Sequence, residues 1–303
     1  GLTAMYGLRY DVGSTPHMPL RFGSYEGVSR KEKSMHVIAV TGGKGGVGKT
    51  NIAVNLGVSM SREGLDVILL DADLGLANVD VILGVSVGST LADVVAGTHQ
   101  LSEVIVEGPE GLRIVPASSG VTRLASLDQA EQNNLVRSFS EQINAPDVLI
   151  VDTGAGIDTT VQTFVSACKT VVVVVCDEPA SLTDAYALMK VMRNDRGVRR
   201  FEILTNQIDS PAQGRKVYER LTTVADKYLD VDLGYLGGVP SDAYLRRAVQ
   251  ERAALVSLYP RSPAAVAIRD AGRRLTSNIY DGAVPGMGFF VEQLLRQPSE
   301  PQH

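Results

Sequence analysis

The sequence predicts an α/β fold with a mostly parallel central sheet and helices on both faces of that sheet. Short apolar runs alternate with helical stretches from His36 onward, and several of the runs are apolar at every position. This alternation is typical of βαβ units, and continuously apolar strands are typical of a sheet covered on both faces. We therefore expect at least six strands, at residues 36–40, 67–70, 148–151, 170–176, 201–205 and 235–239.

Helices are expected between these strands. One is expected at residues 51–63, where Gly64 ends it. Another is expected at residues 182–193, because Ser181 and Asp184 have the spacing of a capping box at its start.

Three regions of the chain differ in composition. Residues 1–34 are interrupted by glycine and proline and end with charged residues, which predicts a flexible leader. Residues 35–284 carry the pattern of strands and helices and are expected to form one domain. Residues 285–303 are expected to form a short amphipathic helix and a polar tail.

The composition is typical of a folded globular protein. Hydrophobic residues make up 44% and charged residues 21% of the 303 positions, and the net charge is −5. That charge argues against a direct nucleic-acid partner, which would require a basic face. No apolar run reaches the roughly 18 residues of a membrane span, and the beginning of the chain lacks a secretory pattern. We expect a cytoplasmic protein in which Cys168 and Cys176 are reduced core thiols.

The strongest motif is a glycine-rich loop between the first expected strand and the first expected helix. It matches G-x-x-x-x-G-K-[ST], the pattern of a phosphate-binding loop, or P-loop. Glycines allow the backbone to curl around phosphate oxygens, the lysine contacts the β- and γ-phosphates, and the threonine hydroxyl ligates Mg²⁺. The alternative is a glycine-rich turn that only connects the strand and the helix. It is disfavoured because ordering so many glycines costs conformational entropy that no bound ligand would offset. The expected nucleotide-binding residues are Gly43, Lys44, Gly45, Gly46, Val47, Gly48, Lys49, Thr50 and Asn51.

Aspartates follow two further expected strands. Asp71 and Asp73 come after the strand at 67–70, and Asp152 comes after the strand at 148–151. Ligands of parallel sheets bind at the carboxyl ends of the strands, so these carboxylates are candidates for holding Mg²⁺ and for orienting the attacking water. Some of them could instead cap the following turns. With Thr50, they form the expected metal site.

Three segments together resemble the MinD/ParA family of ATPases, whose loop is a deviant Walker A motif. They are residues 44–50, 71–80 and 152–156, and the likeness covers roughly residues 36 to 296. The family has a MinD-like fold of the P-loop class, so the resemblance implies that residues 35–284 form an ATPase domain that hydrolyses ATP with Mg²⁺. One departure is Gly154, where many cell-division members have proline.

The resemblance also implies roles for individual residues. In the family, the lysine that corresponds to Lys44 reaches the phosphates of a partner subunit, so ATP is expected to hold a homodimer together. Asp73 corresponds to the residue that positions the hydrolytic water, and Lys49 completes the catalytic set. Asn206 and the turn Pro240-Ser241-Asp242 match the family's base-binding positions. Asn206 could equally be a turn residue, and Asp242 could equally be a helix cap.

Within the family, residues 74–80, 176–188 and 289–292 look most like those of the FlhG/FleN regulators of flagellar number. This likeness implies control of flagellar number or placement through an AAA+ master transcriptional activator. A division-site or cargo-positioning ATPase is the alternative. An iron–sulfur carrier is disfavoured because the two cysteines lack the required spacing. Flagellar members also carry an N-terminal D-Q-A-x-x-L-R motif that engages a partner GTPase, which residues 2–9 resemble only faintly.

The end of the chain permits two interpretations. After the break at Pro285-Gly286, an apolar side of residues 287–296 is formed at helical spacing. By resemblance, this helix lies on the inner face of the cell membrane and makes the protein peripheral. It could also dock on the protein's own core, since its charge attracts anionic lipid only weakly. The residues on the apolar side are Met287, Phe290, Val291, Leu294 and Leu295.

Overall fold

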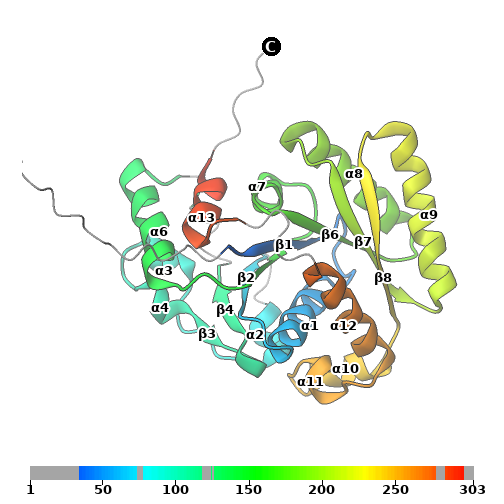
Figure 1. The fold of residues 1–303 in the computed structure, drawn as a ribbon, viewed down its shortest axis with the longest axis horizontal. Coiled ribbons are helices and arrows are strands. Elements are labelled where there is room, and N and C mark those ends of the chain that lie inside the picture. Colours follow the sequence, from blue (N-terminus) through cyan, green and yellow to red (C-terminus); the bar gives the residue numbers. More distant parts are fainter. Residues whose placement is uncertain (1–33, 74–77, 118–123, 125, 278–283, 297–303) are drawn as a thin grey trace, which may run out of the picture. The chain divides into compact units, whose positions relative to one another are not determined.

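The structure, a computed structural model, describes residues 34–73, 78–117, 124, 126–277 and 284–296. An eight-stranded sheet forms its centre, in the order β3-β4-β2-β5-β1-β6-β7-β8 (Figure 1). Among the described strands every neighbouring pair is parallel except β3 and β4. The strands are β1 (His36–Thr41), β2 (Val67–Ala72), β3 (Val106–Glu107), β4 (Arg113–Pro116), β5 (Val148–Thr153), β6 (Thr170–Val175), β7 (Arg200–Ile208) and β8 (Asp232–Pro240).

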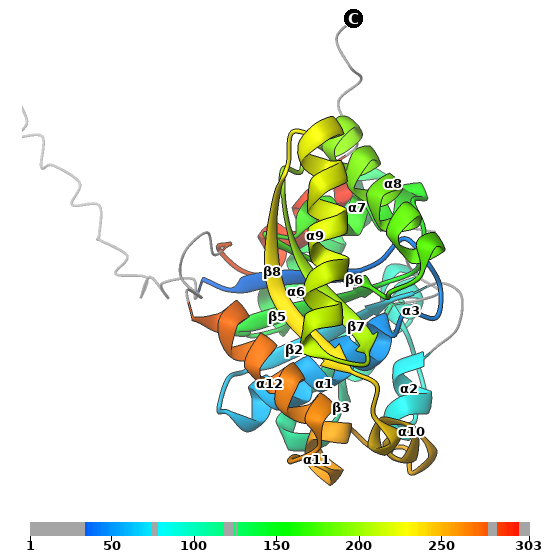
Figure 2. The same ribbon diagram turned by 90° about the vertical axis from the view of Figure 1, so that its right-hand side faces the viewer.

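Helices cover both faces of the sheet, which confirms the predicted fold class (Figures 1 and 2). One face is covered by α1 (Lys49–Arg62), α2 (Asn78–Leu83), α10 (Ala243–Gln250), α11 (Leu255–Leu258) and α12 (Pro263–Thr276). The other face is covered by α3 (Leu91–Val95), α4 (Leu101–Val104), α6 (Gln129–Gln142), α7 (Thr159–Ala167), α8 (Pro179–Arg196), α9 (Pro211–Tyr228) and α13 (Met287–Leu295), and a short 3₁₀ turn (Pro109–Gly111) precedes β4.

All six predicted strands are present, and two strands were not predicted. β3 and β4 have two and four residues, and a turn that contains Pro109 and Gly111 separates them. Such short strands carry no period that a sequence pattern can identify. Four of the predicted strands, β1, β2, β5 and β6, are buried almost throughout, whereas β8 is largely half-buried.

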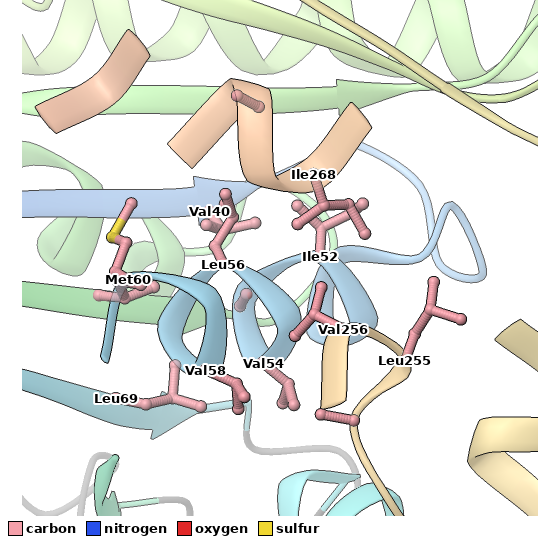
Figure 3. Packing of buried hydrophobic residues seen from close by; sticks show 14 of the residues in the cluster. Val40, Ile52, Val54, Leu56, Val58, Met60, Leu69, Leu255, Val256 and Ile268 are labelled. Carbon is pink, nitrogen blue, oxygen red and sulfur yellow. The ribbon is translucent and has the colours of Figure 1, made fainter. Parts of the chain in front are cut away.

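Helix α1 is enclosed between the sheet and the helices that follow β8. Figure 3 shows Ile52, Leu56 and Met60 of α1 among side chains of the sheet and of α11 and α12. The residues of α1 from Ile52 to Met60 are all buried. This enclosure holds the first turn of α1, which begins at Lys49, in a fixed place against the sheet.

The predicted start of the helix after β6 is wrong. We expected Ser181 and Asp184 to cap a helix that begins at Leu182, but α8 begins at Pro179. Proline has a φ suited to the first turn of a helix and starts it earlier. The Ser181 hydroxyl lies inside the helix and accepts a hydrogen bond from the Cys176 backbone N–H at 3.0 Å.

The C-terminal helix α13 packs against α6 and α7, so its apolar side faces the core. Phe290 is 1% exposed, and Met287, Val291 and Leu294 are also buried. Gly288 permits this close approach, since a Cβ there would lie 1.9 Å from the Ser140 Oγ. Of the two interpretations of this segment, docking on the core is the one that the structure contains.

The predicted leader and the predicted polar tail lie outside the described residues, except for Ser34. Residues 2–9, with their faint likeness to a GTPase-binding motif, also lie outside them. Every helix in the described part of the chain is too short or too polar to cross a bilayer.

Candidate functional site

The P-loop, residues 43–50, leaves the carboxyl end of β1 in the middle of the sheet and enters α1. Gly46 and Gly48 have φ values of 80° and 93°, in the region that favours glycine. At Gly43 the reason is space, because a Cβ would lie 2.2 Å from the backbone of Asp184 in α8. The loop therefore requires glycine at these positions for its conformation and its packing.

A cleft of about 700 Å³ opens beside the P-loop. This volume lies within the roughly 300–1,000 Å³ of small-molecule sites. It brings together seven of the predicted site residues from two segments of the chain, the P-loop with the start of α1 and the segment after β2. These are Gly45, Gly46, Gly48, Lys49, Thr50, Asn51 and Asp73.

Lys49 is the buried cation of the cleft. Its side chain is largely enclosed, and its ammonium donates a hydrogen bond to the Lys44 carbonyl oxygen at 3.3 Å. Burial lowers the pKa of Lys49, against the opposing effect of Asp152 and Asp73. A buried cation with incomplete compensation is stabilised by an anion, so this position suits the phosphates of a nucleotide.

Two buried carboxylates lie side by side behind the P-loop. Asp71 and Asp152 are register partners at the ends of β2 and β5, and Asp152 is fully buried. Burial, reinforced by the charge of Asp71, raises the pKa of Asp152 to about 8, although the Thr50 hydroxyl and Lys49 oppose the shift. Burial likewise raises the pKa of Asp71 to about 6.

These carboxylates fit a divalent cation. Among the described residues, no group has hydrogen-bonding geometry to either carboxylate oxygen of Asp152, and such orphaned buried oxygens are costly without a cation. The described residues contain no group of three or more His, Cys, Asp or Glu side chains that could hold a metal ion by themselves. Mg²⁺ needs few protein ligands, because waters and phosphate oxygens complete its shell. Thr50, Asp71 and Asp152 would hold it, and it would offset the charge of the phosphate oxygens when bound.

Asp73 lines the cleft in front of these buried groups. Its backbone N–H donates to Asp71 Oδ1 at 3.3 Å, which joins the two aspartates of the segment. A Cβ on Gly154 would lie 3.3 Å from Asp73 Oδ1, so the segment after Asp152 directly adjoins this carboxylate. Asp73 is therefore a carboxylate in the wall of the cleft, next to Asp71 and to the segment that follows β5.

Lys44 lies apart from the other loop residues. Its ammonium forms an ion pair with Glu178 at the start of α8, and this contact raises the pKa of Lys44. The side chain is 37% exposed, and Lys44 is not one of the described residues that line the cleft. Its ammonium is therefore directed toward the start of α8 and not into the cleft.

The predicted base-binding residues occupy two different environments. Asn206 is buried and donates from Nδ2 to the Val47 carbonyl oxygen at 2.8 Å. Asp242 caps α10, and its two oxygens accept from the N–H groups of Tyr244 at 2.9 Å and Ala264 at 3.1 Å. Pro240 ends β8, opposite Ile208. Asp242 thus has the cap role that we considered as the alternative, and base binding stays a prediction for all three residues.

Part of the cleft wall was not predicted from the sequence. The unpredicted residues come from the end of β2, from α2, from the segment between β5 and α7, from α7 itself and from α10. Their types are ordinary; most lie close to Asp73 or Asp152 in the chain, but no sequence signal marks Val249 in α10. They are Ala72, Val81, Ile82, Gly154, Ala155, Asp158, Thr160, Val161 and Val249.

The two cysteines are poor metal ligands. Cys176 is buried and Cys168 partly buried, and both are free thiols. Burial raises the pKa of the Cys176 thiol to about 11 and raises that of Cys168 still further. Iron–sulfur clusters require thiolates, which these environments disfavour.

Several known proteins are similar to this chain in sequence. A family model described as an AAA domain matches residues 35–199. The chain is 47% identical over 270 residues to the antiactivator FleN of Pseudomonas aeruginosa, which covers 88% of this chain and 96% of FleN. It is 36% identical over 264 residues to the flagellum site-determining protein YlxH of Helicobacter pylori, which covers 86% and 89% of the two chains.

Solved structures have the same fold. The MinC:MinD cell division complex of Aquifex aeolicus matches with a TM-score of 0.66 and 28% identity, over 80% of this chain and 96% of that chain. MinD of Pyrococcus horikoshii, complexed with Mg-ADP, matches with a TM-score of 0.62 and 23% identity, over 79% and 95%. At that lower identity the likeness concerns the fold alone.

Proposed function

Because the chain belongs to the MinD/ParA family of ATPases, we propose that it works as a regulatory switch that controls flagellar number or placement. The family identifies it as an ATPase that uses ATP and Mg²⁺. In the proposed cycle, ATP joins two copies of the chain, the dimer binds an AAA+ transcriptional activator of flagellar genes, and hydrolysis separates them. Near-full-length likeness to an antiactivator and to a flagellum site-determining protein supports this role.

The position of Lys44 is the main observation that supports a dimer. Within one copy of the chain, Lys44 pairs with Glu178 and does not reach the cleft. In the proposed dimer, Lys44 of each copy contacts the phosphates of the nucleotide bound to the other copy. The cleft also exposes apolar side chains that a second copy would cover. Val81, in the cleft wall, is 60% exposed, and Ile157, two residues beyond Ala155, is 44% exposed. Exposed apolar residues around a cleft are typical of interaction surfaces.

The chemistry proposed for each residue follows from its place. Lys49 and the P-loop N–H groups bind the phosphates, and Thr50, Asp71 and Asp152 hold Mg²⁺. Asp73, at the open side of the cleft, orients the attacking water. Phosphoryl transfer depends chiefly on such positioning and charge compensation.

A direct test of the dimer is molar mass by light scattering with ADP and with ATP. We expect a monomer with ADP, a dimer with ATP, and a monomer for Lys44→Ala under both conditions. Asp73→Ala should remain dimeric with ATP, because it loses water positioning and keeps its binding residues. A monomer for the unsubstituted protein with ATP would contradict the switch.

Mixing two inactive variants tests whether Lys44 acts across the dimer. In a heterodimer of Lys44→Ala and Asp73→Ala, one site has an intact Asp73 and receives an intact Lys44 from the partner. That site should hydrolyse ATP, although each variant alone does not. A mixture without turnover would show that Lys44 acts within its own subunit.

The cellular role is tested by deletion of the gene and by counting flagella and septa. Loss of an antiactivator should raise the number of flagella per cell. Complementation with the unsubstituted chain should restore the number, and complementation with Lys44→Ala should not. Normal flagella with misplaced septa or cargo would instead favour the division-site or cargo-positioning alternative.

Membrane attachment through residues 287–296 is a separate part of the proposal. It requires α13 to leave its site on α6 and α7, since the same apolar side faces the core. We expect more protein to sediment with anionic liposomes in ATP than in ADP, because a dimer presents two helices.

A disulfide can keep α13 docked without removing it from the core. A Cβ on Gly288 would lie 3.3 Å from the Ser140 Cβ, close to the separation of a disulfide. Oxidised Ser140→Cys/Gly288→Cys should lose ATP-dependent sedimentation and regain it after reduction. Equal sedimentation of the oxidised and reduced protein would exclude α13 as the anchor.

A further inference from the structure

We propose that the side-chain amides of Asn206 and Gln207 set the orientation of two successive peptide groups of the P-loop. They are positioning residues, and their contribution is to direct loop N–H groups toward the nucleotide phosphates. The inference rests on ATP binding by the family and is independent of dimerisation and of the flagellar role.

The two contacts are made to adjacent carbonyls. Asn206 Nδ2 donates to the Val47 oxygen at 2.8 Å, and Gln207 Nε2 donates to the Gly46 oxygen at 3.3 Å. In a planar trans peptide, the carbonyl of one residue and the N–H of the next point in opposite directions. Holding the Gly46 and Val47 oxygens toward β7 therefore turns the N–H groups of Val47 and Gly48 away from it, as phosphate binding in a P-loop requires.

A bulge in β7 allows both side chains to reach the same loop. Asn206 pairs with Val239 and Ile208 pairs with Pro240, so Gln207 is the extra residue of the ladder. Its φ is +56°, which is uncommon outside glycine. Successive side chains of a regular strand point to opposite faces of the sheet. The bulge overrides this alternation and brings two consecutive amides to the P-loop.

The absence of a side chain at Gly48 leaves room for the Asn206 amide. A Cβ on Gly48 would lie 2.5 Å from Asn206 Nδ2, so a larger residue there would displace the contact. Asn206 is 3% exposed, and the Val47 carbonyl satisfies its buried donor. Gln207 is exposed at the surface. Its substitution therefore removes the amide contact without opening the core.

Ligands with and without a base can show whether the two amides act through the phosphate-binding loop or contact the adenine. If the amides act through the loop, their loss weakens every ligand that carries the phosphates, including pyrophosphate, which has no base. If they contact the adenine, pyrophosphate binding is unaffected. The two ligands therefore distinguish loop positioning from base recognition.

The test is calorimetric binding of Mg-ADP and of Mg-pyrophosphate to the full chain. Gln207→Gly removes the amide and accepts the positive φ, and Gln207→Met removes the amide but keeps the side-chain length. We expect both variants to bind both ligands roughly threefold to tenfold more weakly, the range for one hydrogen bond. Thermal unfolding should differ between the two variants, because only glycine relieves the backbone.

Glu110→Gly is the matched control. Glu110 is another exposed residue with positive φ, at +57° in the 3₁₀ turn before β4, and it lies outside the cleft lining. It should leave both affinities unchanged. Unchanged ADP affinity in Gln207→Gly and Gln207→Met would overturn the proposal, as would a loss confined to ADP with normal pyrophosphate binding.

Discussion

The nucleotide cleft and the docking site of α13 are both deeply buried, and they differ in what burial leaves unsatisfied. In the cleft, no described residue has hydrogen-bonding geometry to either oxygen of Asp152, and Lys49 is enclosed as a cation. At α13, apolar residues meet apolar residues, and the contact leaves a void of only about 10 Å³. Without a ligand, the buried charges of the cleft lower the stability of the protein, whereas the apolar packing of α13 raises it.

This difference explains why the sequence predicts the ligand of the cleft more narrowly than the partner of α13. Buried charges and glycines at fixed spacing restrict the possible ligand, because few partners satisfy them. An apolar helix side restricts its partner much less, since a protein core and a membrane interface both remove it from water. The following substitutions test this contrast, and they are ordered from the largest expected effect to the smallest.

Phe290→Ala should have the largest effect on stability. Phe290 is fully enclosed between α13 and the core, and truncation of such a residue lowers the free energy of unfolding by about 3–5 kcal/mol. Urea unfolding measures the loss, and Mg-ADP affinity of the folded protein should stay unchanged. Glu292→Ala, on the exposed side of the same helix, is the control and should change stability by less than about 0.5 kcal/mol. Equal stability of both variants would mean that α13 is not docked in solution.

Lys49→Ala should have the opposite pattern of effects, with weaker nucleotide binding and unchanged stability. Loss of the charge that meets the phosphates should weaken Mg-ATP binding roughly a hundredfold, measured by calorimetry. Stability without nucleotide should be kept, because the variant removes a buried cation with incomplete compensation. Undiminished ATP affinity would place the phosphate site elsewhere.

Asp152→Asn should stabilise the protein when no nucleotide or Mg²⁺ is present. Burial raises the pKa of Asp152 from 3.8 to about 8, so between these pH values the unfolded chain releases the proton while the folded protein retains it, and stability falls as the pH rises. The asparagine side chain does not ionise, so the gain in stability should be close to zero near pH 4 and should grow to a few kcal/mol at pH 8. Unfolding midpoints at both pH values measure the effect, and a gain that is larger at low pH would contradict it. Stabilisation by Mg-ADP should be lost in the same variant.

Two glycine substitutions give the smallest contrast. In Gly43→Ala the new Cβ meets the backbone of Asp184, which cannot move aside, so we expect a loss of about 1–2 kcal/mol. In Gly288→Ala it meets the Ser140 hydroxyl, which can rotate, and alanine also favours the helix, so the net change should stay within about 1 kcal/mol. Thermal unfolding of the two variants compares them. A larger loss at Gly288 would mean that the α13 contact is the more rigid of the two.

Much of the fold was predictable, because the buried strands are apolar throughout. The P-loop and the three aspartates were predictable for a different reason, since their chemistry requires particular residue types after particular strands. Strands β3 and β4 were not predicted because strands of two and four residues carry little pattern. The start of α8 was misplaced because Ser181 bonds back to Cys176 instead of capping the helix.

The contact of Gln207 with the P-loop could not be predicted from the sequence. It depends on a bulge that changes which side of the strand a residue faces, and no residue type near Gln207 marks that bulge. Base binding by Asn206 and Asp242 and water positioning by Asp73 remain predictions. Asp73→Ala tests water positioning, and the comparison of ADP with pyrophosphate separates base binding from loop positioning.

The bridge between Met35 and Val284 limits how far α13 can travel. Two backbone hydrogen bonds of 2.9 Å join these residues, at the root of β1 and three positions before α13 begins. A helix that leaves its site while this bridge holds is a tethered ligand, and short tethers give local concentrations of roughly millimolar. A membrane or partner must therefore compete with rapid intramolecular rebinding, and its apparent affinity for α13 is lower than the affinity of the free peptide. The strength of attachment is thus governed by the length of the tether as well as by the apolar side of the helix.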